Sequence, residues 1–87
     1  MNKYFKTSSF DLASFLLSEQ IEMAGVEKHP SGQGKLIFCF FTSDRVMDLV
    51  DDFYSLKAFV KPQEFINAQR TLRSIIYSQK NENKYER

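Results

Sequence analysis

Cysteine, histidine and tryptophan are scarce in this sequence, and the scarcity excludes several classes of protein. The 87 residues contain one cysteine, Cys39, one histidine, His29, and no tryptophan. A single cysteine cannot form an intrachain disulfide, which small secreted domains usually need, so we expect a cytoplasmic protein. Zinc sites need several cysteine and histidine ligands, which this chain does not have. We therefore expect no metal and no other cofactor.

An excess of charge and a long apolar run are also missing. The formal net charge is +1, with 12 lysines and arginines against 11 aspartates and glutamates. The field of the whole molecule therefore does not steer it toward nucleic acid or an anionic membrane. The longest apolar run, Leu36 to Phe41, is far shorter than the roughly 20 residues that span a bilayer. The N-terminus lacks the apolar run of a signal peptide, and we expect no membrane association.

The first half of the chain predicts a strand, a helix and a β-hairpin. Residues 4–7 are β-prone, and Ser8 then fits the N-cap of a helix over about 9–19, whose buried positions follow the helical spacing. Alternating residues predict a strand over 21–27, and a strongly apolar segment predicts another over 35–42, with turn-forming residues between them. Both faces of the second strand are apolar, so we expect it to be central and covered on both sides.

Two further helices are expected in the second half. Ser43 fits an N-cap, and Val46, Leu49, Val50 and Phe53 recur at helical spacing after it. A short extended piece, 58–60, precedes Pro62, which suits the first position of a long helix. The buried face of that helix is predicted to carry Phe65, Ala68, Leu72, Ile75 and Ile76.

These elements predict one small α+β domain. Their order is β-α-β-β-α-(β)-α, where the bracket marks the extended piece 58–60. A small antiparallel sheet, made of the hairpin and the short N-terminal strand, would be packed by three helices. The domain is expected over residues 1–80, with a frayed tail over 81–87 that has little to bury.

Groups for covalent or acid–base catalysis are hard to find in this chain. Cys39 lies between Phe38 and Phe40, whereas a nucleophilic thiolate needs an electropositive, partly exposed site. His29 lies in the predicted hairpin loop and is interpreted as a turn residue. The pair Gly32 and Gly34 is interpreted as part of that loop, because no phosphate-binding motif surrounds it. We expect the protein not to be an enzyme.

Four aspartates form a stripe on the predicted second helix. They are Asp44, Asp48, Asp51 and Asp52. Rigid helical aspartates rarely converge on one divalent ion, and a solvated polar face is the simplest interpretation. Asp48 forms like-charge i,i+4 pairs with Asp44 and Asp52, and each pair costs a few tenths of a kcal/mol. A basic partner protein would offset that cost, so we also consider this stripe a candidate protein-binding surface.

A basic stripe interrupted by one aromatic residue lies on the predicted last helix. Its members are Arg70, Arg73, Tyr77, Lys80, Lys84 and Arg87. Such a face could contact phosphates and stack on a base, or meet an acidic protein. A solubilising face whose cations suit the helix C-terminus explains the same pattern.

The order of several short motifs resembles a family of small bacterial and phage domains of unknown function. The opening runs from Phe5 through Asp11-Leu12-Ala13, and Phe38-x-Phe40 and 49–54 follow. The closing part is Val60-x-Pro62-x-x-Phe65-x-x-Ala68, then Leu72-Arg73-x-x-Ile76-Tyr77. Most of these positions are caps or core, so the resemblance implies a shared fold rather than a site. It also implies a context of short reading frames in bacteria and mobile elements.

The sequence therefore favours two candidate functions. The first is a non-catalytic regulatory module that acts by protein–protein contact, with an outside partner or as a homo-oligomer. An inhibitor of a host defence complex would fit a phage context, by analogy only. The alternative is a nucleic-acid-binding protein that uses the basic face of the last helix, with affinity that falls as salt rises.

Overall fold

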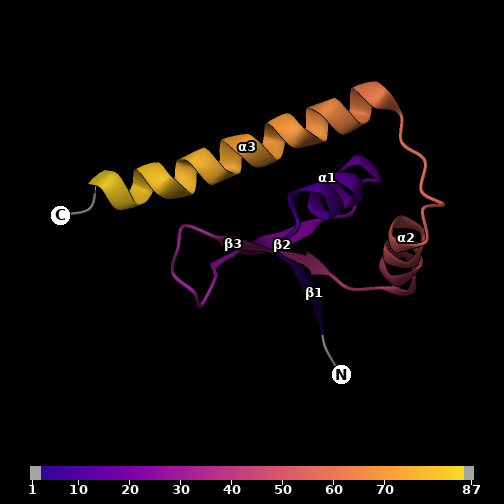
Figure 1. Ribbon diagram of the computed structural model, residues 1–87, viewed down its shortest axis with the longest axis horizontal. Helices are drawn as coiled ribbons and strands as arrows, with labels where there is room; N and C mark the ends of the chain where they lie inside the picture. Colours follow the sequence, from indigo (N-terminus) through magenta and orange to yellow (C-terminus); the bar gives the residue numbers. More distant parts are fainter. Residues whose placement is uncertain (1–2, 86–87) are drawn as a thin grey trace.

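The order of elements along the chain is the one that the sequence predicts. The elements are β1 (Tyr4–Thr7), α1 (Phe10–Ser18), β2 (Met23–Lys28), β3 (Leu36–Phe41), α2 (Asp44–Tyr54) and α3 (Pro62–Tyr85) (Figure 1). This computed structural model describes the backbone of residues 3–85 and the side chains of residues 3–79. The extended piece 58–60 joins no sheet and serves as the connection between α2 and α3. The α+β fold class is confirmed.

The side chains of the tail expected over 81–87 lie outside the described residues, and the backbone of α3 is helical to Tyr85. None of the described helices is both long and apolar enough to cross a membrane.

The three strands form one antiparallel sheet in the order β1-β3-β2. Tyr4 on β1 pairs with Phe41 on β3, and Lys28 on β2 pairs with Leu36 at the other end of β3. A register shift between Met23 and Gly25 marks a β-bulge in β2. The central place predicted for β3 is therefore confirmed, and the predicted hairpin forms with its loop at 29–35.

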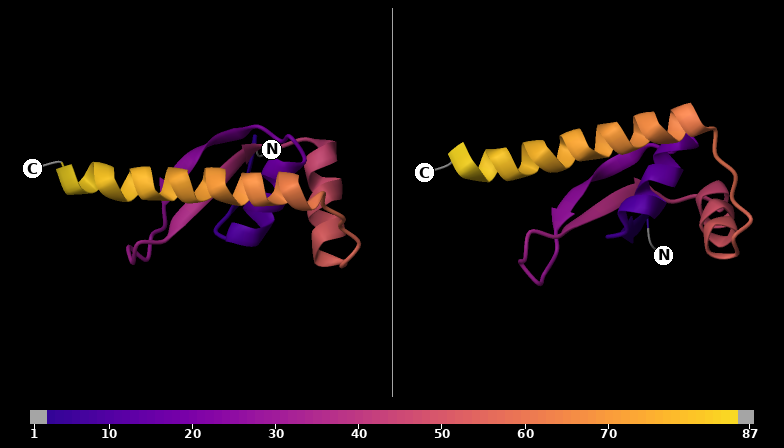
Figure 2. Two further views of the ribbon diagram at one scale, coloured as in Figure 1. Left: turned by 90° about the horizontal axis from the view of Figure 1, so that it is seen from above. Right: turned by 45° about the horizontal axis from the view of Figure 1, so that its top comes forward.

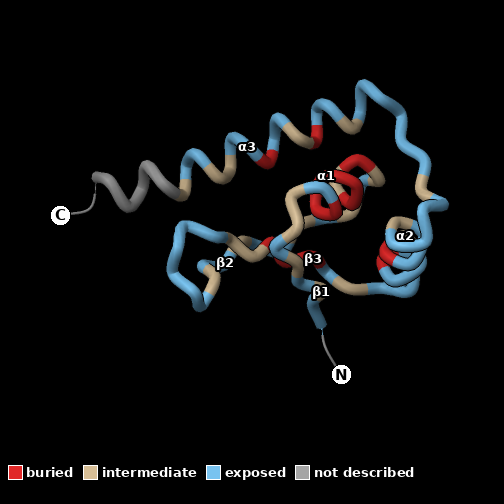
Figure 3. Tube along the Cα trace, viewed as in Figure 1, coloured by how far each residue is buried: buried red, intermediate tan, exposed pale blue. Residues whose placement is uncertain are grey.

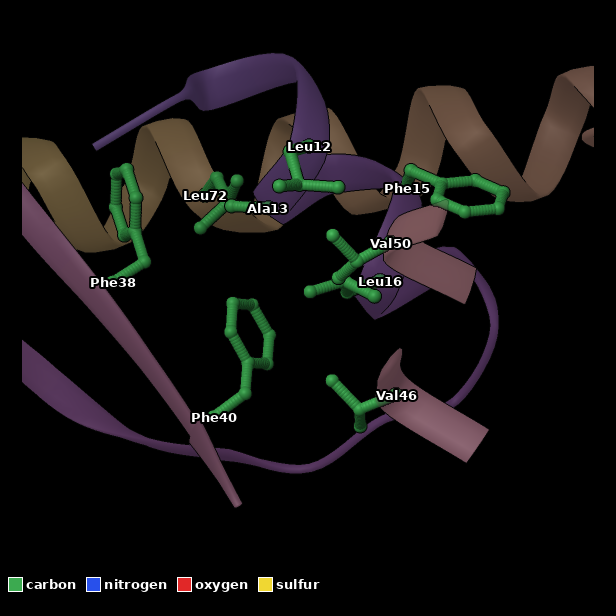
Figure 4. Close-up of a cluster of buried hydrophobic side chains, with 9 residues drawn as sticks. All are labelled: Leu12, Ala13, Phe15, Leu16, Phe38, Phe40, Val46, Val50 and Leu72. Atoms are coloured by element: carbon green, nitrogen blue, oxygen red, sulfur yellow. The ribbon is translucent and has the colours of Figure 1, made fainter. Parts of the chain in front are cut away.

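The helices pack in layers on one face of this sheet. Helix α1 lies between the sheet and α3, while α2 lies at one end of the molecule (Figures 1 and 2). The buried cluster at their centre consists of Leu12, Ala13, Phe15, Leu16, Phe38, Phe40, Val46, Val50 and Leu72 (Figure 4). Every helix and the central strand contribute to it, so this single core holds all the elements together.

The expectation that β3 is covered on both sides is wrong. Phe38 and Phe40 point into the core, but none of the described helices covers the opposite face, where Phe41 and its neighbour Tyr4 remain more than 40% exposed (Figure 1). The three helices of the described residues all pack on the Phe38 side (Figures 1 and 2). Cys39 also belongs to this face and is nevertheless buried, with 5% of its surface exposed.

The helix caps agree with the sequence at α2 and differ at α1. Ser43 is the N-cap of α2, where its hydroxyl accepts a hydrogen bond from the Val46 amide at 3.2 Å. The N-cap of α1 is Ser9 and not Ser8, because the Ser9 hydroxyl accepts from the Leu12 amide at 3.1 Å. The Ser9 amide in turn donates to the side chain of Thr7, the last residue of β1, at 3.0 Å. The helix therefore begins one residue later than the capping pattern suggests.

Candidate protein-binding surface

The four aspartates of the predicted acidic stripe lie on the outward side of α2. This acidic row consists of Asp44, Asp48, Asp51 and Asp52, all of which are exposed. No ion pair within the described residues involves any of them. Among those residues no group of three or more His, Cys, Asp or Glu is arranged to hold a metal ion. The row is therefore an uncompensated negative surface.

A cation on α2 is directed away from this row. The Arg45 guanidinium donates to the backbone oxygen of Glu19 at 2.9 Å and pairs with the Glu19 carboxylate at 3.3 Å. This contact ties the start of α2 to the end of α1. Arg45 consequently leaves the charge of the acidic row unbalanced.

Apolar side chains flank the acidic row and continue beyond the end of α2. Met47 and Tyr54 are exposed on the same flank of the helix, seven residues apart. Leu56 and Phe59 follow in the connection to α3 and are 92% and 88% exposed. Figure 3 shows this connection as an almost continuously exposed segment at the end of the molecule. We call Met47, Tyr54, Leu56 and Phe59 the apolar ridge.

The backbone at the end of α2 directs Leu56 outward. Ser55 is the C-cap, and Leu56 adopts a left-handed conformation with φ of 62°. Such a conformation costs a residue with a side chain about 1–2 kcal/mol, and glycine avoids that cost. The sequence nevertheless places a large apolar residue there, almost fully in solvent. Folding alone does not account for this choice.

A groove of about 470 Å³ opens beside the apolar ridge. It is lined by Phe15, Phe53, Tyr54, Leu56, Ala58, Val60 and Phe65. These residues come from all three helices and from the connection, and none of them is charged. The Phe15 and Phe53 rings lie 5.8 Å apart. The groove could hold an apolar side chain of another molecule.

The described part of the predicted basic stripe lies on the outward side of α3. Arg70 and Arg73 are exposed, and Tyr77 is 67% exposed. The Arg73 guanidinium also lies 5.3 Å from the centre of the Phe10 ring, in a cation–π contact that joins α3 to the start of α1. The side chains of Lys80 and Lys84, and Arg87 as a whole, lie outside the described residues. The acidic row is on α2 and the basic stripe on α3, two helices that the exposed connection 55–61 joins (Figure 3).

The two residues considered for catalysis are placed apart. His29 lies in the hairpin loop, where its Nδ1 accepts from the Ser31 amide at 3.1 Å. Cys39 lies in the middle of the sheet, and burial raises the pKa of its thiol, with a further contribution from Glu27. Glu27 pairs with Lys6 at 3.1 Å, and this bond raises the pKa of Lys6. His29 is therefore held by a contact within its own loop, whereas Lys6, Glu27 and Cys39 influence one another in the sheet.

Sequence reasoning identified the acidic row but missed the apolar ridge. Tyr54, Leu56 and Phe59 had no assigned role, because their spacing marks neither a buried nor an exposed face. The sequence did contain one signal for the ridge. Segment 55–61 holds three large apolar residues but is too short to form both a strand and its turns, so these residues had no sheet in which to be buried.

Comparison with known proteins places the chain in a family without an assigned activity. No curated protein and no solved structure matches it. Residues 2–78 match a family described as a domain of unknown function, DUF5659. The match spans every strand and most of α3, which agrees with the resemblance seen in the sequence. The chain therefore belongs to the DUF5659 family of domains of unknown function.

Proposed function

We propose that this protein is a non-catalytic binding module that acts by contact with another protein. The observation that carries the proposal is the near-complete exposure of Leu56 and Phe59 beside an open apolar groove. Burying a Leu or Phe side chain stabilises a complex by about 1.5–3 kcal/mol. Large exposed apolar patches rimmed by polar residues mark interaction sites in soluble proteins.

The acidic row supports the same surface. Its like-charge pairs oppose helix formation slightly and find no compensating cation in the described structure. A partner that supplies apolar contact and positive charge would both cover the exposed apolar side chains and offset the repulsion between the aspartates. A single buried cysteine agrees with action in a reducing cytoplasm. Regulation of a host complex, such as inhibition of a defence system, is a role that a module of this size could fill in a phage or mobile element.

The proposal is tested by photocrosslinking in cells that naturally produce the protein. A benzophenone amino acid is placed at Phe59, and a control is placed at Gln33 in the hairpin loop. We expect one crosslinked protein from position 59 and none from position 33. That protein is then identified, purified and titrated with the wild type and with Phe59→Ser, which should bind about tenfold or more weakly. Identical products from both positions, or none from position 59, would count against the proposal.

Nucleic-acid binding remains the second candidate, because Arg70, Arg73 and Tyr77 share an outward face of α3. It predicts that fluorescence anisotropy detects an oligonucleotide complex at low salt that weakens steeply as salt rises. The double variant Arg70→Gln/Arg73→Gln should lose that complex. Absence of binding by the wild type at low salt would exclude this function.

A further inference from the structure

Two pairs of residues on α2 share one spacing. Met47 and Tyr54 are seven residues apart, and so are Asp44 and Asp51. Seven residues are two helical turns, or about 10.5 Å along the axis. Asp51 is four residues after Met47 and three before Tyr54, so it lies beside both apolar side chains. The exposed flank of α2 therefore presents an apolar line bordered by an acidic line.

This arrangement supplies one of the two apolar positions that a helix–helix seam has in every seven residues. In such seams apolar residues repeat every seven positions, and charged residues along the edge select the partner by opposite charge. Here the inner side of α2 is already used, because Val46 and Val50 are buried in the core. The Met47 and Tyr54 line is a second apolar line on the same helix, and it stays partly open to solvent, with Met47 45% and Tyr54 66% exposed.

The groove lies where this line ends. Tyr54 belongs to both, since it lines the groove together with Leu56 and Phe53. A helix that packed along Met47 and Tyr54 would continue over the groove and could insert one apolar side chain there. Positive side chains on its edge, two turns apart, would lie next to Asp44 and Asp51.

We propose that the partner of this surface is an amphipathic helix of another protein, with apolar residues spaced by about two turns and lysines or arginines at the same interval along one edge. The inference rests on the proposed function and specifies the chemistry of the partner. The charge of the acidic row disfavours an acidic helix at the same apolar line. A second copy of this chain would have to offer α3, whose outward face carries only Ile66 and Tyr77 as exposed apolar residues among those described.

Two synthetic peptides test this inference directly. Both are alanine-based helices with leucines two turns apart, and they differ only in the edge residues, which are lysine in one and glutamate in the other. Each is titrated into ¹⁵N-labelled protein while amide chemical shifts are recorded. We expect the lysine peptide to shift Met47, Asp51, Tyr54 and Leu56, and to bind about tenfold or more tightly than the glutamate peptide.

Variants separate the two parts of the surface. Met47→Ser/Tyr54→Ser should abolish binding of the lysine peptide, since it removes the apolar line. Asp44→Asn/Asp51→Asn should reduce the preference for lysine over glutamate to less than about threefold. Glu22→Gln, which removes an exposed charge just before β2, is the matched control and should change neither.

Equal binding of both peptides, or shifts confined to other surfaces, would overturn the inference. Either result would leave the proposed function to be judged by the crosslink at position 59, because that experiment assumes no particular partner chemistry. A crosslinked partner without a basic helix would likewise overturn the inference and support the proposed function.

Discussion

Leu72 shows how much one side chain on α3 contributes to the fold. It has no exposed surface and joins α3 to the core, whereas Ile66, six residues earlier on the same helix, is 41% exposed. We expect Leu72→Ala to lower the free energy of unfolding by about 3 kcal/mol, as for other large-to-small changes in protein cores. Ile66→Ala should cost less than about 1 kcal/mol. Urea denaturation followed by circular dichroism measures both, and equal losses would contradict the packing described.

Leu56 should behave in the opposite way. Glycine tolerates its left-handed conformation, and the leucine side chain is almost entirely in solvent. Leu56→Gly is therefore expected to raise stability by about 0.5–1 kcal/mol while it weakens partner binding. Gln20→Gly is the matched control, because Gln20 has the similar φ of 67° after α1. The control should gain stability and retain the crosslink at Phe59; loss of stability in both variants would refute the argument.

Cys39 provides a test of pH dependence. Its pKa is raised by burial, so the folded state disfavours the thiolate relative to the unfolded chain. Its contribution to stability is present below the unfolded pKa of about 8.5 and is lost as the pH rises through the folded value. We expect alkylation of Cys39 to be much slower in the native protein than in urea at the same pH. The variant Cys39→Ala should lose less stability between neutral and alkaline pH than the wild type.

At the scale of elements, periodicity predicted the helices and the central strand because burial imposes a repeat on the residues that face the core. The start of α2 could be predicted in the same way, because the Ser43 side chain caps the helix through a local hydrogen bond. The open face of the sheet could not be predicted, since Ile37, Cys39 and Phe41 have the composition of a covered face. Whether a face is covered depends on where the helices pack, and a single strand's sequence does not contain that information.

The candidate site also has one part that the sequence predicts and one part that depends on tertiary packing. The acidic row could be predicted because the helical repeat places its residues on one side of α2. The apolar ridge could not, because Leu56 and Phe59 have no repeat and their exposure results from the path of the connection over the end of the core. Tertiary arrangement decided which apolar residues remained uncovered.

The N-cap of α2 should contribute measurably to the stability of that element. Removal of the hydroxyl in Ser43→Ala leaves the Val46 amide without its hydrogen bond. We expect a loss of about 1 kcal/mol in the free energy of unfolding. Ser8→Ala, next to the cap of α1, should have almost no effect, since Ser9 forms that bond. Chemical denaturation of the two variants compares them, and a larger loss from Ser8→Ala would contradict the cap assignment.

At the scale of the whole molecule, the positions of the charged faces limit how copies of the chain can associate. The acidic row lies on α2 and the basic stripe on α3, and the connection 55–61 separates the two helices along the chain (Figure 3). An acidic-to-basic contact between copies is heterologous unless two such contacts close into a symmetric pair. Heterologous contacts that do not close into a ring propagate into open chains.

The mass of the protein in solution tests this geometry. We expect light scattering after size exclusion to give the monomer mass of 10.2 kDa at high salt, where screening weakens contacts between exposed charges. At low salt, an open acidic-to-basic contact between copies would make the mass rise gradually with concentration, with no plateau at the dimer, whereas a constant monomer mass agrees with a different protein as the partner of the acidic row. A discrete dimer at both salt concentrations would require a closed, largely apolar interface, and the open sheet face around Tyr4 and Phe41 would then become the surface to mutate first.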